Sequence, residues 1–308
     1  FLCRRWTGWT SESHEYQEFS NHWAQGHETT AVILQSATGS SVETLDAARH
    51  ALDLGVLTVA LTNTPGSVLE ELCDECICFS TGQRCGPDVS VLTTRLMMLY
   101  LLALEIGAAT GSLHTHEVEQ LGAAIGHLPE VAAQFLEDED LNVSQIANAL
   151  KDQQALILVG GGANWFSARE GALKVEEESS LLCKTYRPAE YLHNAIPLLS
   201  DQVATVAIAP PGKSYARLHD VVRTARVAQS PTLAVVVEGD DTLASDASFV
   251  IAVPGPLGEL LMPPLAAIVF QLLGYYLGAE RGVNPDALRT DDLDHARAWL
   301  PAFPFGSH

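Results

Sequence analysis

Basic side chains are scarce in this sequence, which has 17 Lys and Arg against 38 Asp and Glu and a formal net charge of -21 at pH 7. A polyanion would meet net repulsion before it met a specific contact, so neither nucleic acid nor a membrane surface is expected as a partner. A charged share of only 18% beside a hydrophobic share of 47% also excludes a disordered chain. With 308 residues, the chain has room for two domains.

Cysteine, with six residues, is too sparse for a disulfide framework, so we expect a reduced, cytoplasmic protein. Four of the six, Cys73, Cys76, Cys78 and Cys85, have a spacing that a zinc site could use. Residues 75–79 alternate like a strand, however, which would place Cys76 and Cys78 on one face and bury them as small apolar side chains. We therefore predict no metal site in this chain.

Uninterrupted apolar runs of membrane-spanning length are missing. Residues 89–110 and 257–282 come closest, but Arg95 interrupts the first run and a proline pair at 263–264 interrupts the second. Both runs are predicted to be buried helices. The first six residues lack an initiator Met and the apolar core of a signal peptide, so we expect the chain to begin partway through its gene product.

Strand and helix patterns alternate along the chain in two similar halves. The predicted strands are short apolar runs, at 30–35, 56–61, 76–80, 155–159, 203–209, 232–237 and 248–253. The predicted helices show apolar residues three and four apart, at 42–54, 90–106 and 165–179. This alternation predicts the α/β class with two tandem domains, each a doubly wound, mostly parallel sheet flanked by helices.

The domain boundaries follow from these patterns. We place the first domain at 1–112, a helical connector at 113–153, the second domain at 154–281 and a C-terminal tail at 282–308. Within the connector, the acidic run at 137–140 is interpreted as a solvated helix cap or link.

The turn after the first predicted strand is rich in hydroxyl groups, from Ser36, Thr38, Ser40 and Ser41. It precedes a helix, whose first backbone N–H groups and dipole attract an anion without a lysine, so a phosphate is the expected ligand. A serine-rich N-cap that only ends a turn would have the same sequence, and this feature alone leaves both interpretations open. The corresponding glycines at 160–162 fit no nucleotide fingerprint, and we predict no nucleotide.

The helix that follows these glycines carries Glu170, Lys174 and Glu177 at positions i, i+4 and i+7, which align on one helical stripe. Such a stripe is typical of an exposed, salt-bridged face, but here the helix starts at the edge of the sheet where ligands bind. Further along, His193 lies in a segment without periodicity, which predicts a loop from which the imidazole could reach a ligand.

Several segments together give the sequence a family resemblance. They are Ser36–Thr44 (SATGSSVET), Gly86–Arg95 (GPDVSVLTTR), Ala168–Glu177 (AREGALKVEE), Ala189–His193 (AEYLH) and Gly282–Asp286 (GVNPD). The sequence resembles tandem sugar isomerase (SIS) domains over nearly its whole length. The likeness is to the isomerase half of glucosamine-6-phosphate synthase and to related amino-sugar-phosphate deaminases.

The resemblance implies roles for individual residues. Glu177 corresponds to the base that moves a proton between sugar C1 and C2, and His193 to the ring-opening acid/base, which a neighbouring subunit contributes, so a homodimer is expected. Glu170 and Lys174 would support these two groups. The residues expected at the phosphate and the sugar are Ser36, Ala37, Thr38, Ser41, Val91 and Thr93. The resemblance implies a phosphorylated sugar as substrate, with no cofactor and no metal.

The sequence departs from the family pattern at three places. Leu293 occupies the position of a Schiff-base lysine, which makes synthase-type imine chemistry doubtful. The family's His-Gly-Pro is His193-Asn194-Ala195 here, and the family's opening strand and Gly-Thr-Ser turn are not visible before Ser36. Two functions therefore remain: an isomerase of a phosphorylated aldose, ketose or amino sugar, with or without deamination, and a non-catalytic sugar-phosphate sensor.

Overall fold

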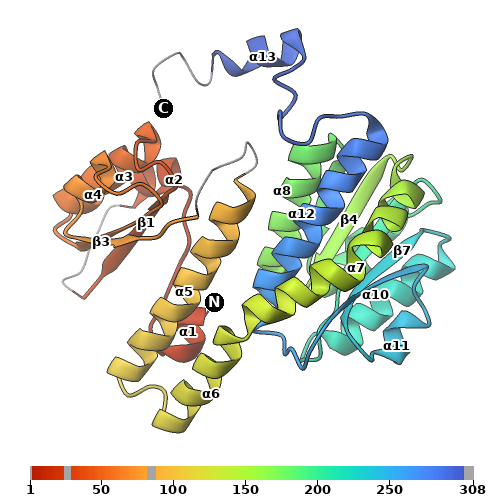
Figure 1. Ribbon diagram of the computed structural model, residues 1–308, viewed down its shortest axis with the longest axis horizontal. Helices are drawn as coiled ribbons and strands as arrows, with labels where there is room; N and C mark the ends of the chain where they lie inside the picture. Colours follow the sequence, from red (N-terminus) through yellow and green to blue (C-terminus); the bar gives the residue numbers. More distant parts are fainter. Residues whose placement is uncertain (1, 24–28, 82–87, 302–308) are drawn as a thin grey trace.

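Two lobes, each containing a parallel β-sheet, make up the computed structural model, which describes residues 2–23, 29–81 and 88–301 (Figure 1). Among the described residues, the first sheet has three strands in the order β1-β2-β3 and the second has five in the order β5-β4-β6-β7-β8. All strand pairs within these sheets are parallel. The predicted α/β class with two parallel sheets flanked by helices is confirmed.

The strands are β1 (Ala31–Ser36), β2 (Leu57–Thr62), β3 (Glu75–Cys78), β4 (Ala155–Gly160), β5 (Leu182–Tyr186), β6 (Val203–Ile208), β7 (Thr232–Val237) and β8 (Phe249–Val253). The helices are α1 (Leu2–Trp6), α2 (Tyr16–His22), α3 (Val42–Asp53), α4 (Val68–Leu72), α5 (Val89–Ala109), α6 (Thr115–Gly126), α7 (Leu128–Leu150), α8 (Asn164–Ser179), α9 (Pro188–Asn194), α10 (Tyr215–Val227), α11 (Asp241–Ala244), α12 (Met262–Arg281) and α13 (Leu293–Trp299), with a 3-10 turn at Ile196–Leu198.

In the first lobe, α3 covers one face of the sheet. Its apolar stripe, which includes Leu45, Ala48 and Ala51, packs with Leu34 of β1 and Ala60 of β2 in one buried cluster. The short helix α4 packs on α3 and β2 on the same side. Because the strands are parallel, the turns that follow β1, β2 and β3 all lie at one edge of the sheet.

The second lobe is a three-layer sandwich. Alternate strand residues such as Leu156 and Leu158 face a cluster formed with α7, α8 and α12, whereas Ile157 and Val159 face α9, α10 and α11. Strands that are buried on both faces have nearly continuous apolar sequences, which is why β4, β6 and β7 were predictable as runs. Among the described residues, α8 packs most extensively against α12.

The helix α5 connects the lobes. The Tyr100 hydroxyl on α5 donates to the carbonyl of Leu260, just before α12, and Gln271 Nε2 on α12 donates to the carbonyl of Val89 at 3.1 Å. Both α5 and α12 have the length and apolar composition to span a membrane. In the most apolar stretch of α12, 67% of the residues are buried, but in that of α5 only 28% are. The predicted burial is therefore confirmed for α12 and wrong for α5, whose neighbours leave part of its apolar surface uncovered.

Other local predictions need correction. The acidic run at 137–140 lies in the middle of α7 rather than at a cap or link, and β5 was not predicted. Cys76 and Cys78 share one face of β3, but Cys76 is half-buried and Cys78 is exposed. The prediction that both are buried is wrong: β3 is an edge strand of the three-stranded sheet, paired among the described residues with a neighbour on one side only. Cys85 lies outside the described residues.

Candidate functional site

The turn after β1 is held by its own hydroxyl groups. The Gly39 backbone N–H donates to Ser36 Oγ at 3.0 Å, and Ser36 Oγ and Ser41 Oγ lie 3.2 Å apart. The Ser40 N–H donates to Thr38 Oγ1 at 3.2 Å. Ser41 stands at the N-cap of α3 but makes no capping hydrogen bond with its side chain, so the first turn of α3 keeps backbone N–H groups available to an anion.

Residues just after β2 hold this turn in place through hydrogen bonds. The Ala37 carbonyl accepts hydrogen bonds from the Asn63 N–H at 3.2 Å and from the Thr64 hydroxyl at 3.0 Å. Gly39 has a φ of 64° and packs so closely on Ser67 that a Cβ at position 39 would lie 2.2 Å from Ser67 Oγ. The turn conformation therefore requires glycine and is set by contacts beyond the turn.

The predicted stripe on α8 is present, but it is not an exposed face. Lys174 Nζ lies 2.7 Å from Glu177 Oε2 and 3.9 Å from Glu170 Oε1. Lys174 is only 5% exposed, while the two carboxylates are half-buried. An ammonium group shielded from water interacts more strongly with neighbouring carboxylates than one on the surface, so this pair differs from an ordinary helical salt bridge.

A second cation approaches this stripe from the first lobe. Arg95 on α5 lies close enough to Glu170 that each affects the ionisation of the other. Burial raises the pKa of Glu170; Lys174 and Arg95 oppose that rise, and Glu177 adds to it. Burial lowers the pKa of Arg95, against the effects of Glu170 and Asp88. The sequence analysis missed this role for Arg95, although a single arginine within an apolar helix was a signal.

His193 lies on a short helix, which corrects the prediction of a loop. Pro188 occupies the first turn of α9, and the Glu190 carboxylate accepts the Arg187 N–H at 3.0 Å, so this helix has a regular N-terminal cap. The His193 side chain is exposed. Within the described chain it makes no hydrogen bond or ion pair with Glu177.

The remaining predicted contacts, Val91 and Thr93, lie at the start of α5. Residues 86 and 87, the first two of the 86–95 segment that carries the family resemblance, lie outside the described residues. Val91 is buried in an apolar cluster with Leu61 and Phe79, so its side chain does not face a ligand. The Val91 N–H belongs to the first turn of α5, where backbone donors lack helical partners. The Thr93 hydroxyl donates to the Val89 carbonyl at 3.2 Å.

A groove of about 520 Å³ runs between α5, α8 and α12. Leu92 and Leu96 line it from α5, Glu170 and Leu173 from α8, and Ala267 from α12. Of the predicted site residues, this groove includes Glu170. No hydrogen bond or ion pair connects the turn after β1 to the α8 stripe among the residues that the structure describes.

The glycine turn of the second lobe is already filled by a carboxylate. Glu259 Oε1 accepts a hydrogen bond from the Ser214 hydroxyl at 2.9 Å, and Oε2 accepts one from the Lys213 N–H at 3.3 Å. A Cβ at Gly162 would lie 2.9 Å from Glu259 Oε1. This carboxylate occupies the position of an anion, so the turn after β1 is the better anion site of the two.

Glu178, next to the predicted base, is the most deeply buried carboxyl group near the site. It is 2% exposed, lies against Gly274 and Gly278 of α12, and its Oε2 has no hydrogen-bond partner. Burial raises the pKa of Glu178 to about 8; Lys174 opposes this rise, and Glu177 and Asp286 add to it. The sequence analysis missed this residue.

Comparison with known proteins agrees with this architecture. A family model described as the SIS domain matches residues 2–105 and 149–281. The isomerizing glutamine–fructose-6-phosphate aminotransferase of Clostridium acetobutylicum is 28% identical over 265 residues, which cover 84% of this chain and 43% of that protein. The enzyme of the same name from Pyrococcus horikoshii is 29% identical over 259 residues, 84% of this chain and 42% of that protein. The chain thus spans less than half the length of these relatives.

Solved structures share the fold at low identity. The C-terminal domain of glucosamine-fructose-6-phosphate aminotransferase from Francisella tularensis has a TM-score of 0.84 and 19% identity, and the match covers 92% of this chain and 80% of that one. Glucosamine-6-phosphate deaminase from Thermotoga maritima has a TM-score of 0.71 at 19% identity, with 93% and 82% covered. Tagatose-6-phosphate ketose/aldose isomerase from Escherichia coli has a TM-score of 0.75 at 15% identity, with 93% and 78% covered.

Proposed function

The chain belongs to the SIS domain family, and on that premise we propose that it isomerises a phosphorylated aldose, ketose or amino sugar by moving a proton between C1 and C2. The observation that carries this proposal is the 2.7 Å ion pair between the buried Lys174 ammonium and the half-buried Glu177 carboxylate. Relatives and structural neighbours are named as enzymes that act on hexose phosphates or amino-sugar phosphates.

Glu177 is the proposed base. In the aldose-to-ketose direction its carboxylate removes the proton from C2 to give an enediolate, the hydroxyl proton moves from O2 to O1, and the same carboxyl group returns the carbon-bound proton to C1. The Lys174 ammonium would stabilise the negative charge that develops on the sugar oxygens during proton transfer. A well-placed general base contributes about 10²- to 10⁴-fold to such a rate.

The phosphate of the substrate is proposed to bind the turn Ser36–Ser41. Hydroxyl groups from Ser36, Thr38 and Ser41 and the N–H groups at the start of α3 provide donors without a basic side chain, and the Ala37 carbonyl is already used to hold the turn in place. The Val91 N–H and the Thr93 hydroxyl, at the start of α5, are the proposed contacts to the sugar.

His193 is the proposed acid/base for ring opening, provided by a second copy of the chain. Its side chain is exposed on α9 and makes no hydrogen bond or ion pair with Glu177 within the described chain. Both observations fit a histidine that functions in a neighbouring subunit. The proposal therefore includes a homodimer as the active form.

The proposed reaction does not use an imine with a lysine at the C-terminus. Leu293 begins α13 at the position where the resemblance puts that lysine, and its side chain is exposed. Proton transfer between C1 and C2 needs only the carboxylate, so isomerisation is compatible with leucine here. Where the substrate is an amino sugar, release of ammonia would need water to attack the imine that isomerisation itself generates.

A sugar-phosphate sensor without catalysis is the second candidate. The replacement at Leu293 and the altered sequence after His193, Asn194-Ala195, favour it. A sensor, however, needs no buried ammonium next to a carboxylate on α8.

A panel of 6-phosphorylated aldoses, ketoses and amino sugars separates the two candidates. We expect at least one to be converted, as measured by aldose–ketose conversion or ammonia release, and Glu177→Gln to abolish turnover while binding is kept. Glu137→Gln, an exposed glutamate on α7, is the control and should leave turnover unchanged. Tight binding of a member of the panel without turnover would favour the sensor. Turnover unaffected by Glu177→Gln would contradict the proposed mechanism.

A further inference from the structure

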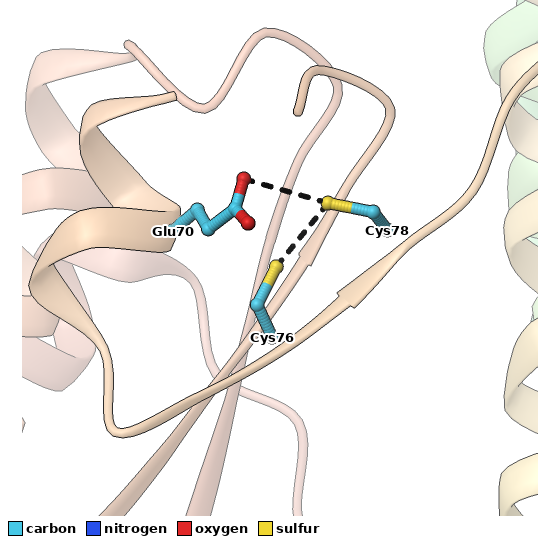
Figure 2. A group of neighbouring side chains, drawn as sticks. All are labelled: Glu70, Cys76 and Cys78. Atoms are coloured by element: carbon cyan, nitrogen blue, oxygen red, sulfur yellow. Dashed lines mark hydrogen bonds between the residues drawn. The ribbon is translucent and has the colours of Figure 1, made fainter. Parts of the chain in front are cut away.

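Two thiols and a carboxylate lie close together beside β3, the edge strand of the first sheet. Cys76 and Cys78 project from the same face of β3, and Glu70 projects towards them from α4 (Figure 2). One potential ligand atom from each of the three lies within 4.8 Å of the other two. None of these residues belongs to the proposed isomerase site.

Two of the distances within this group are close to those of a tetrahedral metal site. The two sulfur atoms are 3.4 Å apart, and Cys78 Sγ lies 3.6 Å from Glu70 Oε2. A tetrahedral zinc ion, with about 2.3 Å to sulfur and about 2.1 Å to oxygen, requires roughly 3.8 Å between two sulfur ligands and roughly 3.6 Å between sulfur and oxygen. The separation between Cys78 Sγ and Glu70 Oε2 already fits, and the sulfur–sulfur separation needs to widen by a few tenths of an ångström.

Backbone structure positions all three ligands. Extended backbone places residues i and i+2 of a strand on one side, which brings Cys76 and Cys78 together. Glu70 Oε2 accepts the Gly66 N–H at 2.6 Å, and Ser67 caps the same short helix, so the carboxylate is directed at the thiols before any ion arrives. The group is also accessible, since Cys78 is exposed and the other two are half-buried.

We propose that Glu70, Cys76 and Cys78 bind a zinc ion, with water in the fourth position. Two sulfur ligands and one carboxylate suit zinc better than magnesium or calcium, which prefer all-oxygen sites. This differs from the sequence prediction of no metal because the third ligand comes from α4 rather than from the cysteine pattern. Each thiol loses its proton as its sulfur binds the ion, so binding releases two protons to solvent.

The site adjoins the proposed phosphate turn. Cys78 pairs with Thr62 in the sheet, and Thr62 pairs with Ser36. Ser67, at the start of α4, packs on Gly39 of the turn. An ion between α4 and β3 would therefore stabilise one wall of that turn, and zinc should raise the thermal stability of the chain.

Zinc binding to the full chain can be measured directly by competition with a chromophoric chelator, in a phosphine reductant that keeps the cysteines as thiols. We expect one equivalent to bind to the wild type with release of two protons. Cys76→Ser, Cys78→Ser and Glu70→Gln should each weaken this binding by about tenfold or more. Cobalt should give a thiolate-to-metal absorption band that Cys76→Ser and Cys78→Ser reduce.

Matched controls come from the same chain. Glu71→Gln changes the exposed neighbour of Glu70 on α4, and Cys3→Ser changes a half-buried cysteine on α1; both should bind zinc like the wild type. Zinc binding that is equally strong in the double variant Cys76→Ser/Cys78→Ser would overturn the proposal. An affinity unaffected by Glu70→Gln but lost in the cysteine variants would overturn the carboxylate ligand, and no measurable binding would overturn the site as a whole.

Discussion

Lys174 directs its ammonium group at Glu177, with 2.7 Å between Nζ and Oε2, from a position that water hardly reaches. A helix normally exposes such a pair to solvent, where it contributes little to stability. Here α12 packs closely against α8, and Arg95 from the other lobe lies near Glu170, the third member of the stripe. The ion pair therefore lies where the two lobes meet.

Replacing Lys174 with methionine should lower turnover far more than substrate binding. Without the ammonium, the carboxylate of Glu177 loses its nearest opposite charge, and the enediol loses electrostatic stabilisation. We expect kcat for the active substrate to fall by about 10²-fold or more, with a smaller change in KM. Lys151→Met is the control, since Lys151 forms a 3.0 Å ion pair with Glu280 at the surface, and it should retain wild-type kcat. Equal effects of the two substitutions would argue against a catalytic role for the buried pair.

Glu178 should make the protein less stable as the pH rises. Its pKa is raised to about 8 in the folded chain from an ordinary 4.5, so between these values the folded state holds a proton that the unfolded state releases. The contribution of Glu178 to unfolding free energy therefore falls from about pH 4.5 to about pH 8. Glu178→Gln should remove this slope and stabilise the protein by on the order of 3 kcal/mol at pH 7.

Urea unfolding at several pH values measures this effect as the difference between the wild type and the variant. Glu176→Gln, on the same helix but exposed, should preserve the wild-type slope and change stability by less than about 1 kcal/mol. A constant difference between wild type and Glu178→Gln from pH 5 to pH 8 would show that Glu178 is ionised in the folded protein.

Gly39→Ala should disrupt the phosphate turn. An added methyl group would collide with Ser67 and also strain a backbone with φ of 64°. We expect a loss of about 2 to 3 kcal/mol in unfolding free energy and weaker binding of sugar phosphate. Gly55→Ala has a similar φ of 70° with open space around it, so it should cost only about 1 kcal/mol and leave ligand binding intact. Normal phosphate binding by a folded Gly39→Ala variant would place the anion elsewhere.

Glu259→Ala should create a second anion site. It removes the carboxylate that accepts hydrogen bonds from Ser214 and the Lys213 N–H, which leaves donors at the glycine turn of the second lobe. A titration with inorganic phosphate, followed by phosphorus NMR, should detect one more bound phosphate than in the wild type. Glu238→Ala, an exposed control, should bind as the wild type does. Unchanged stoichiometry in Glu259→Ala would show that this turn does not bind phosphate.

Much of the fold could be predicted because buried parallel strands leave strong sequence signals. Six strands and α3, α5 and α8 were placed nearly at their observed bounds from apolar runs of the right period, and β3 was placed within two residues. The strand β5 was missed because it lies at the edge of its sheet and has an exposed leucine at its start and an exposed Lys184 within it. An edge strand that is covered on one side only lacks the continuous apolar run.

The candidate site could be predicted only in part. Spacing within one helix was enough to align Glu170, Lys174 and Glu177. Arg95 approaches Glu170 from about 75 residues away in the sequence, and Glu259 fills the glycine turn of the second lobe from about 45 to 100 residues away. Periodicity does not encode such long-range contacts. The burial of Glu178 depends on small residues in α12 that allow two helices to pack closely.

The central claim is that the Glu177 carboxylate transfers a proton at C2, and exchange with deuterated water tests it most directly. A 6-phosphorylated substrate identified by the panel should gain deuterium at C2 when it is incubated with the wild type in deuterium oxide, as followed by proton NMR. The account predicts that Glu177→Gln binds the same sugar but exchanges its C2 proton at least about 10²-fold more slowly. Wild-type exchange rates in a folded Glu177→Gln protein would contradict it.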